Sequence, residues 1–526
     1  REDKVNQQIV RHVGQAVTDR EVEELKKLAR SIIEEMKKSK PQQQMLPIFS
    51  PENILKAKGA KKPVSDESQS KNLREEQRII DGIGDVFGRL YSDLGLDNIL
   101  INTKKNKQWN SILKSCILAR IANPDSKRGT AAFLESDYAI RIHLDKIYRM
   151  MDHVFKNEKR IKSQICSNTL SLFEEEVNVL FFDVTTLYFE SFEPDELREN
   201  GYSKDNKFKE TQVVLALVTT QGGLPITFKT FPGNTYEGHT LIDITEELQK
   251  EYKVKNVLLV ADRAMFNDDN LGALESLGVN YIVAAKLKTL SKALKKQILG
   301  DDDFGAQIVE NELHWIKEYE HKNRRLIVSY SSKRSRKDAF DRQKLIDRLL
   351  KKVKNGKIKI KDIIPNYGTK KYLKVENSSA EINESKISDD AKWDGLYGVI
   401  SNSDLNPKDI LSKYRGLWQI EEAFRVSKHD LEMRPIFHWT PNRIKAHILI
   451  CYIAYSLIKQ ALHRIKLQQT ELSFEMIREE LLRVQSSLYS DIATKEKIII
   501  PSKVTPTQKK IYQVFGLKRS NVPYSL

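Results

Sequence analysis

Three side chains at intervals of seven residues distinguish the stretch from Tyr414 to Lys428, YRGLWQIEEAFRVSK. They are the phenol of Tyr414, the carboxylate of Glu421 and the ammonium of Lys428. Apolar residues recur among charges and there is no Pro, so the stretch is predicted to be one helix. Seven residues are almost two helical turns, which would place all three groups on one face. A carboxylate between a phenol and an ammonium suits a site that binds metal and phosphate.

Neighbouring residues of this stretch offer alternatives and additions. Glu422 competes with Glu421, but only Glu421 is seven residues from both Tyr414 and Lys428. Arg425 is four residues beyond Glu421 and therefore close to its face, where a guanidinium can bind phosphate through two parallel hydrogen bonds. Trp418 is a candidate DNA-binding residue that would stack on a base, although packing in the core is the alternative that its large apolar ring favours.

Two aspartates further upstream each end an apolar segment. Asp183 ends VNVLFFD and Asp262 ends NVLLVAD, and both segments are predicted to be strands. Ligand sites in α/β sheets lie at the carboxyl ends of strands, although a single Asp there more commonly caps a turn. Together with Glu421 the two aspartates supply hard oxygen ligands suited to two Mg²⁺ or Mn²⁺ ions. Arg263 follows Asp262 directly and is placed to face a phosphate.

The order Tyr, Trp-x-Ile-Glu and Lys resembles the Y-R-E-K signature of cut-and-paste insertion-sequence transposases with a DDE domain. LFFDVTTLYFES and LLVADRAMF extend the resemblance upstream, to roughly residues 75–465 in all. It implies an enzyme of ribonuclease-H-like fold, with Asp183, Asp262 and Glu421 as catalytic metal ligands. One position departs from the signature, because Leu417 stands where the pattern has Arg.

The predicted elements agree with that fold class. From Val177 the order is β-β-β-α-β-α-β, which an α/β ribonuclease-H-like core with a mixed sheet requires. Helical regions are expected earlier, including Arg74–Leu94, and a helix followed by a basic, mobile tail is expected at the end. The predicted division is an N-terminal helix (19–38) and linker over 1–75, a helical DNA-binding region over 76–170, the first part of the catalytic core over 171–285, a mixed insertion domain over 286–394, the second part of the core over 395–465, and the C-terminal helix and tail over 466–526.

The charge of the chain favours a polyanionic partner. The 526 residues carry a formal net charge of +16. Residues 331–374 hold sixteen Lys and Arg against four Asp and Glu, and a basic helix is expected over 334–354. We expect Lys351, Lys352 and Lys354 to contact the DNA backbone. We expect the same of the basic residues near Lys127 and Arg128. For each of these residues the alternative is a solvated basic face.

Composition also indicates the cellular compartment. The three cysteines match no zinc spacing and are consistent with a reduced, cytoplasmic setting. The most apolar run, 446–457, is much shorter than the ~20 residues that span a bilayer. We see no signal peptide, although the sequence begins with Arg1, so a leading segment with such a signal could precede it. The resemblance places the protein with the nucleoid of a bacterium or archaeon.

The resemblance implies a DNA transposase that binds the inverted ends of its element, cleaves them and joins the 3′ ends to target DNA. Its partners would be double-stranded DNA, both transposon ends and target, and a second copy of the chain, with no membrane. Two other interpretations remain open: a Mg²⁺-dependent nuclease of the same fold, and a decayed or repurposed transposase that only binds DNA. The absent signature Arg at Leu417 is the one feature that favours the latter.

Overall fold

The computed structural model describes residues 26, 30, 72–100, 107–172, 179–189, 193–201, 210–252, 257–262, 267–354, 371–376, 379–468 and 472–525. The chain forms two compact units. The central unit, so called for its position in the sequence, contains Leu258–Gly416, and the flanking unit contains the described residues of Gln44–Val257 and Leu417–Leu526. Of the helix predicted over residues 19–38 only Lys26 and Arg30 are described, both as helical, and the linker predicted over 40–71 lies outside the described residues.

An antiparallel meander of three strands forms the core sheet of the flanking unit, in the order β4-β3-β2. Its strands are β2 (Val179–Tyr188), β3 (Gln212–Thr220) and β4 (Pro225–Pro232). Every residue of β3 is buried, as its uninterrupted apolar sequence predicts. The predicted hairpin turn is confirmed, and Gly223 adopts a φ of +75°, which only Gly tolerates easily. Helix α7 (Glu237–Lys250) packs on β3 and β4.

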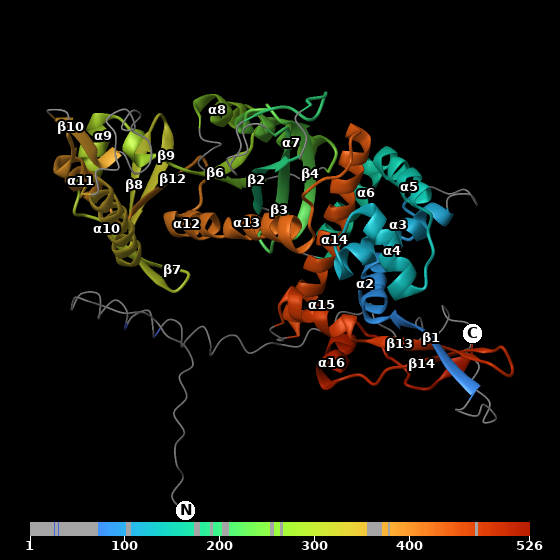
Figure 1. The fold of residues 1–526 in the computed structure, drawn as a ribbon. Coiled ribbons are helices and arrows are strands. Elements are labelled where there is room, and N and C mark those ends of the chain that lie inside the picture. The colour runs from blue at the N-terminus through green and yellow to red at the C-terminus, as the bar shows by residue number, and fades with distance from the viewer. Residues whose placement is uncertain are drawn as a thin grey trace, which may run out of the picture. The chain divides into compact units, whose positions relative to one another are not determined.

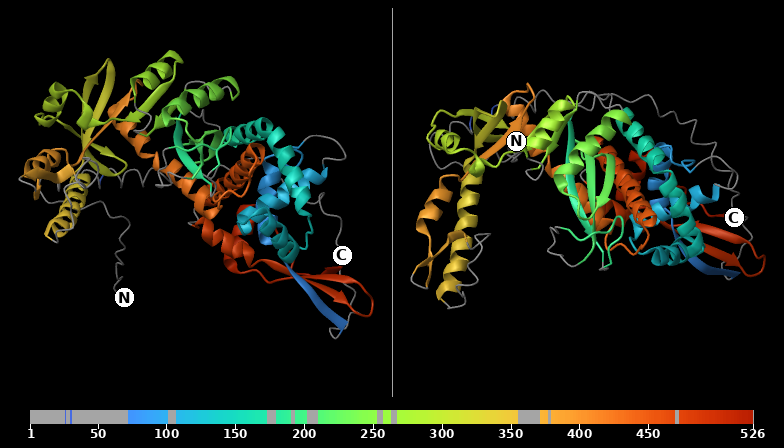
Figure 2. Two further views of the ribbon diagram at one scale, coloured as in Figure 1. Left: turned by 45° about the horizontal axis from the view of Figure 1, so that its top comes forward. Right: turned by 90° about the horizontal axis from the view of Figure 1, so that it is seen from above.

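Helices that precede and follow this sheet in the sequence make up much of the flanking unit (Figures 1 and 2). The long helix α14 (Pro441–Leu467) is buried along most of its length and packs against α2, α3, α5 and α6. None of the helices in the described ranges is long and apolar enough to cross a membrane. The other helices of this unit are α2 (Gly82–Asp93), α3 (Lys107–Ala122), α4 (Lys127–Tyr138), α5 (Leu144–Lys156), α6 (Glu158–Leu172), α13 (Trp418–Arg425), α15 (Phe474–Leu482) and α16 (Pro506–Val514).

A second sheet joins the two ends of the flanking unit and corrects two expectations. Residues Leu73–Ile80, predicted to be helical, form strand β1, which pairs antiparallel with β13 (Gln485–Asp491). The Glu- and Gln-rich sequence favours a helix, but pairing with a segment about 400 residues away overrides that local preference. The C-terminal residues, predicted to be a mobile arm, instead form β14 (Lys497–Pro501), α16 and β15 (Tyr524–Ser525).

The central unit contains the strand order β5-β6-β12-β9-β8-β7. Strands β5 (Leu258–Ala261) and β6 (Asn280–Ala284) are parallel, and β12 (Leu396–Ser401) is antiparallel to both β6 and β9. The return of β12 to the core is thus confirmed. Three strands of the predicted insertion continue the core sheet: β7 (Gly305–Val309), β8 (Glu312–His321) and β9 (Arg324–Tyr330). Its other two strands pair only with each other.

Helices of the central unit accompany these strands. The predicted basic helix is confirmed as α10 (Ser332–Lys354). The remaining elements are α8 (Asp268–Ser276), a 3₁₀ turn at Leu287–Thr289, α9 (Lys292–Leu299), the hairpin β10 (Leu373–Glu376) and β11 (Ser379–Ile382), α11 (Glu384–Ala391) and α12 (Pro407–Arg415). The order β2-β3-β4-α7-β5-α8-β6 along the chain is the predicted one. The fold is therefore mixed α/β of the ribonuclease-H-like class, with a helical region before the core.

A cluster of buried bases lies between α4, α14 and the segment before α14. Lys127, predicted to belong to a DNA-binding face, is instead 5% exposed. Its ammonium lies 3.2 Å from Nδ1 of His447, and the His447 ring lies 5.5 Å from that of His438. Burial, together with the cations Lys127, Arg443 and Arg120, lowers the pKa of His438 to about 3. Burial also lowers the pKa of Lys127 to about 8.

This cluster predicts a loss of stability in mild acid. Below pH 6.5 the unfolded chain binds a proton at His438 that the folded chain does not bind, so the free energy of unfolding falls as pH falls. From pH 7 to pH 5 the loss from one such histidine is about 2 kcal/mol. Urea unfolding at both pH values should show that His438→Phe loses about 2 kcal/mol less than the unsubstituted chain. An equal loss in both proteins would mean that His438 is protonated in the folded state.

Candidate active site

Asp183 lies in the middle of β2, not at its end as predicted, because the β-branched and aromatic residues that follow it continue the strand to Tyr188. Its partner across the sheet is Leu217 of β3. The side chain is half-buried, and one carboxylate oxygen accepts a hydrogen bond of 2.7 Å from the backbone N–H of Val184. A carboxylate is thus placed on a face of an otherwise apolar sheet, where burial of a charge requires polar partners.

Helix α13 brings Glu421 to the flanking unit and packs against β2 and β3. Its buried residues are Ile420, Ala423 and Phe424, whereas Glu421 is exposed. Glu422 is half-buried, and its charge acts on two residues of α14. Burial raises the pKa of Tyr455, and Glu422 raises it further. Burial lowers the pKa of Lys459, and Glu422 opposes that shift. Since Glu422 faces α14, Glu421 is the carboxylate of this helix that is accessible to a ligand.

Lys428 follows in a π-helical turn, Val426–Asp430, in which the N–H of Leu431 bonds to the carbonyl of Val426. Its ammonium donates to the hydroxyl of Thr185. Thr185 is two residues from Asp183 on the same strand, so both side chains lie on one face of the sheet. The structure thus brings Lys428 to the face that carries Asp183. Turns of this widened kind occur frequently at functional sites.

The single helix predicted over 414–428 is wrong. Helix α12 ends at Arg415, α13 begins at Trp418, and Gly416 and Leu417 form a turn between them. Both residues keep right-handed helical backbone angles, with φ and ψ of −62° and −10° at Gly416 and of −59° and −23° at Leu417. Gly lowers helical stability at this point, and the Leu417 side chain is buried at 7% exposure. Tyr414 therefore belongs to the central unit, whereas Glu421 and Lys428 belong to the flanking unit.

Tyr414 and Asp262 are both part of the central unit. The ring of Tyr414 lies 5.4 Å from that of Tyr397 on β12. Burial raises the pKa of Tyr397, and the Tyr414 hydroxyl and the Asp262 carboxylate raise it further, so Asp262 lies near this aromatic pair. Asp262 directly follows β5, as predicted, and is exposed. Arg334 of α10 covers the Tyr397 ring at 4.7 Å.

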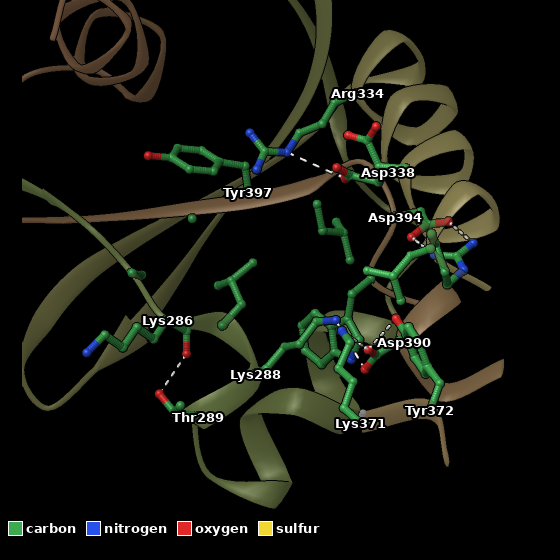
Figure 3. A pocket seen from close by; sticks show the side chains of 18 residues that line it. Lys286, Lys288, Thr289, Arg334, Asp338, Lys371, Tyr372, Asp390, Asp394 and Tyr397 are labelled. Carbon is green, nitrogen blue, oxygen red and sulfur yellow. Dashed lines mark hydrogen bonds and ion pairs between the residues drawn. The ribbon is translucent and has the colours of Figure 1, made fainter. Parts of the chain in front are cut away.

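A cavity of about 560 Å³ lies beside Tyr397 in the central unit (Figure 3). Its charged groups largely pair with one another: Arg342 with Asp394, and Lys371 and Lys288 with Asp390. Burial would raise the pKa of Asp390, but hydrogen bonds from Lys371 and Tyr372 hold it below its usual range. Lys286 is exposed at this cavity, next to the end of β6.

The arginines near the predicted site differ in their contacts. Arg415 donates to a carboxylate oxygen of Glu312 at 2.7 Å and lies 3.1 Å from Nε2 of His314. Burial and Arg415 lower the pKa of His314 to about 4, so a neutral ring accepts this hydrogen bond. Arg415 is therefore a structural residue of the β7–β8 hairpin. Arg425 is exposed and its closest ion pair, with Asp430, is 3.4 Å.

Comparison with known proteins identifies the family. Residues 176–457, more than half of the chain, match the family model described as a transposase DDE domain. The chain belongs to this family. The match includes both predicted aspartates and Glu421. None of the curated proteins matches the sequence.

Solved structures of other transposases resemble the chain only distantly. A piggyBac transposase synaptic complex with hairpin DNA is 10% identical, with a TM-score of 0.39, over 76% of this chain and 77% of that one. A Mos1 paired-end complex with the left transposon end is 14% identical, with a TM-score of 0.15, over 34% and 59% of the two chains. A Mos1 complex with Mn is 13% identical, with a TM-score of 0.14, over 30% and 54%.

The donor set of this DDE domain is compatible with hard divalent cations. Asp183, Asp262 and Glu421 are carboxylates, and the last two are exposed. Within the described ranges no three His, Cys, Asp or Glu side chains lie close enough together to hold a metal ion. The structure assigns Asp183 and Glu421 to the flanking unit and Asp262 to the central unit. Arg263 lies outside the described residues.

One expectation about a single residue changes, and two residues were missed. Trp418 is the first residue of α13 and is 56% exposed, so the predicted core packing is wrong. Of the three predicted basic contacts of α10, Lys351 is exposed, and Lys352 and Lys354 lie in the last turn of that helix. Thr185 and Tyr397 were not predicted. The period of two from Asp183 points to Thr185, whereas nothing in GLYGVIS indicates that Tyr397 meets Tyr414.

Proposed function

We propose that the chain is a DNA transposase that binds the inverted ends of an insertion sequence, cleaves them and joins the 3′ ends to target DNA. The main support is that the family match covers the strands and the helix that carry Asp183, Asp262 and Glu421. The contact between Lys428 and Thr185 adds a cation on the Asp183 face. Carboxylates with an adjacent ammonium are what phosphodiester chemistry requires.

Each residue has a distinct role in this proposal. Asp183, Asp262 and Glu421 hold two Mg²⁺ or Mn²⁺ ions, which when bound supply activation of the attacking oxygen and stabilisation of the leaving oxygen. Lys428 positions a phosphate of the cleaved strand beside Asp183. Tyr414 donates a hydrogen bond to a phosphate from the central unit. Arg425 supplies the guanidinium that the buried Leu417 cannot supply.

Double-stranded DNA, as transposon end and as target, is the proposed partner, and a net charge of +16 favours it. A homodimer on DNA, each subunit acting on an end bound partly by the other, is the assembly that the family resemblance implies. The DNA-binding-only alternative has one supporting observation, the burial of Leu417 at 7% exposure where the signature has Arg. Incubation with Mg²⁺ and a duplex that ends in a 3′ hydroxyl separates the alternatives. Joined products indicate a transposase, cut products alone a nuclease, and a shifted band without new products a binding protein.

The first prediction concerns the carboxylates. Asp183→Ala, Asp262→Ala and Glu421→Ala should each reduce cleavage and joining by at least about a thousandfold, because each removes a metal ligand. Affinity for end DNA should stay within about threefold, because phosphate contacts elsewhere supply most of it. Glu422→Ala is the matched control, since Glu422 faces α14. Normal cleavage by Glu421→Ala with loss of cleavage in Glu422→Ala would move the assignment by one residue.

The second prediction separates the two arginines. Arg425→Ala should slow single-turnover cleavage of a pre-bound end about ten- to a hundredfold, roughly 1.4–2.7 kcal/mol of barrier. Arg415→Ala should slow it less, and should instead lower the unfolding midpoint, because it breaks the contacts with Glu312 and His314. If Arg415→Ala is the slower enzyme at unchanged stability, then Arg415 rather than Arg425 contacts the phosphate.

The third prediction concerns the basic helix α10. Replacing Lys351, Lys352 and Lys354 together by Ala should weaken binding to every DNA sequence and reduce the salt slope of log K by up to about 3, near one unit per lost phosphate contact. The matched control replaces Lys292, Lys295 and Lys296 of α9, which removes the same charge elsewhere in the central unit. An equal change of slope in both triple variants would mean that only total charge matters.

A further inference from the structure

The segment between the π turn and α14 presents two aromatic rings to solvent. Met433, Ile436 and His438 are buried at 3%, 6% and 8% exposure, whereas Phe437 and Trp439 are 62% and 67% exposed. The two exposed rings thus lie on either side of the buried His438 in the sequence. Large apolar side chains exposed together in this way indicate a binding surface.

Buried contacts fix this segment, so the exposure does not reflect a loose loop. The ring of His438 lies 5.5 Å from that of His447 and meets Tyr148 edge-on at 6.1 Å. Nε2 of His447 lies 3.1 Å from the carbonyl oxygen of Met433. The Arg120 guanidinium donates to the carbonyl of Leu431 at 3.4 Å. The two exposed rings are therefore held in place before any ligand binds.

Cations lie next to these rings. Arg198, whose side chain is 9% exposed, lies 5.5 Å from the centre of the Trp439 ring and is held by Asp195 at 2.7 Å. Arg198 also lies 5.8 Å from the ring of Phe189. Arg434 covers Tyr188 at 5.2 Å. Aromatic rings interleaved with arginines are the surface that single-stranded nucleic acids bind, through base stacking and phosphate pairing.

The segment follows β2 away from the proposed site. Lys428 contacts Thr185, Arg434 covers Tyr188, and Trp439 meets Arg198 over Phe189. From Thr185, which Lys428 contacts, to Phe189 the strand advances four residues, roughly 13 Å. A single DNA strand covers that distance in about four nucleotides even at the duplex rise of roughly 3.4 Å each. A strand with a phosphate at Lys428 therefore reaches Trp439 with its next few bases.

We propose that Phe437 and Trp439 form a stacking platform for unpaired bases of DNA next to the cleaved phosphodiester. This inference rests on the proposed function, because it takes the position of the strand from the Asp183 site. Unpaired bases fit better than a duplex, since the faces of paired bases are covered by their neighbours in the stack. They fit better than an apolar protein partner, since the Arg198 guanidinium lies against the Trp439 ring and a phosphate can pair with it.

The test measures binding without divalent metal, so that it does not depend on cleavage. Three fluorescently labelled probes of equal length are used: an oligo-dT strand, an abasic strand and a duplex. The double variant Phe437→Ala with Trp439→Ala should bind oligo-dT about ten- to a hundredfold more weakly, and the duplex and the abasic strand within about twofold of the unsubstituted chain. Trp439→Phe should retain most of the affinity for oligo-dT. The control Tyr236→Ala removes a ring that is 55% exposed elsewhere in the flanking unit and should change nothing.

Unchanged oligo-dT affinity in the double variant, at an unchanged unfolding midpoint, would overturn the proposal. So would an equal loss on the abasic strand, because the segment would then bind only backbone. Dissociation of a dimer at unchanged DNA affinity would assign the rings to a contact between copies of the chain, and would also overturn it. If the proposed function fails, cleavage is absent in every variant while the difference between oligo-dT and abasic DNA remains.

Discussion

The contact between Lys428 and Thr185 is the interaction on which the arrangement of the candidate residues in the flanking unit depends. It fixes the π turn after α13 to the strand that carries Asp183, and thereby places an ammonium and a carboxylate on one sheet face. The ridge of Ile420, Ala423 and Phe424 buries the other side of α13, which leaves Glu421 exposed. A helix positioned only by exposed charges would not hold these groups, because exposed ion pairs contribute little to stability.

The three proposed carboxylates come from two units of the chain. Asp183 and Glu421 belong to the flanking unit, and Asp262 belongs to the central unit with Tyr414. The chain crosses between the units at Val257–Leu258 and again at Gly416–Leu417, next to Asp262 and Glu421 respectively. Each unit therefore supplies a carboxylate within a few residues of a crossing. In the central unit, the Tyr397 ring contacts the Tyr414 ring, and the charge of Asp262 acts on Tyr397.

Much of the core was predictable because its strands are apolar and its helices periodic. Strands β2 to β6 and helices α7 and α8 follow the predicted order along the chain, because burial of a strand on both faces leaves a continuous apolar run that reveals it. Predictions were wrong where distant contacts outweigh local sequence. LREEQRII forms a strand because β13 pairs with it, and Lys127 is buried because α14 packs over it. The turn at Gly416 and Leu417 interrupts the helix between Tyr414 and Glu421, which a count of seven residues does not reveal.

The central claim is that Asp183, Asp262 and Glu421 hold metal together when end DNA is bound. Replacing Mg²⁺ by Fe²⁺ and adding ascorbate and peroxide cleaves the backbone next to bound metal, and mass spectrometry of the fragments locates the cuts. The account predicts cuts beside all three residues, and their joint loss in Glu421→Ala but not in Glu422→Ala. Cuts beside only one or two of the three residues, or cuts that persist in Glu421→Ala, would contradict it.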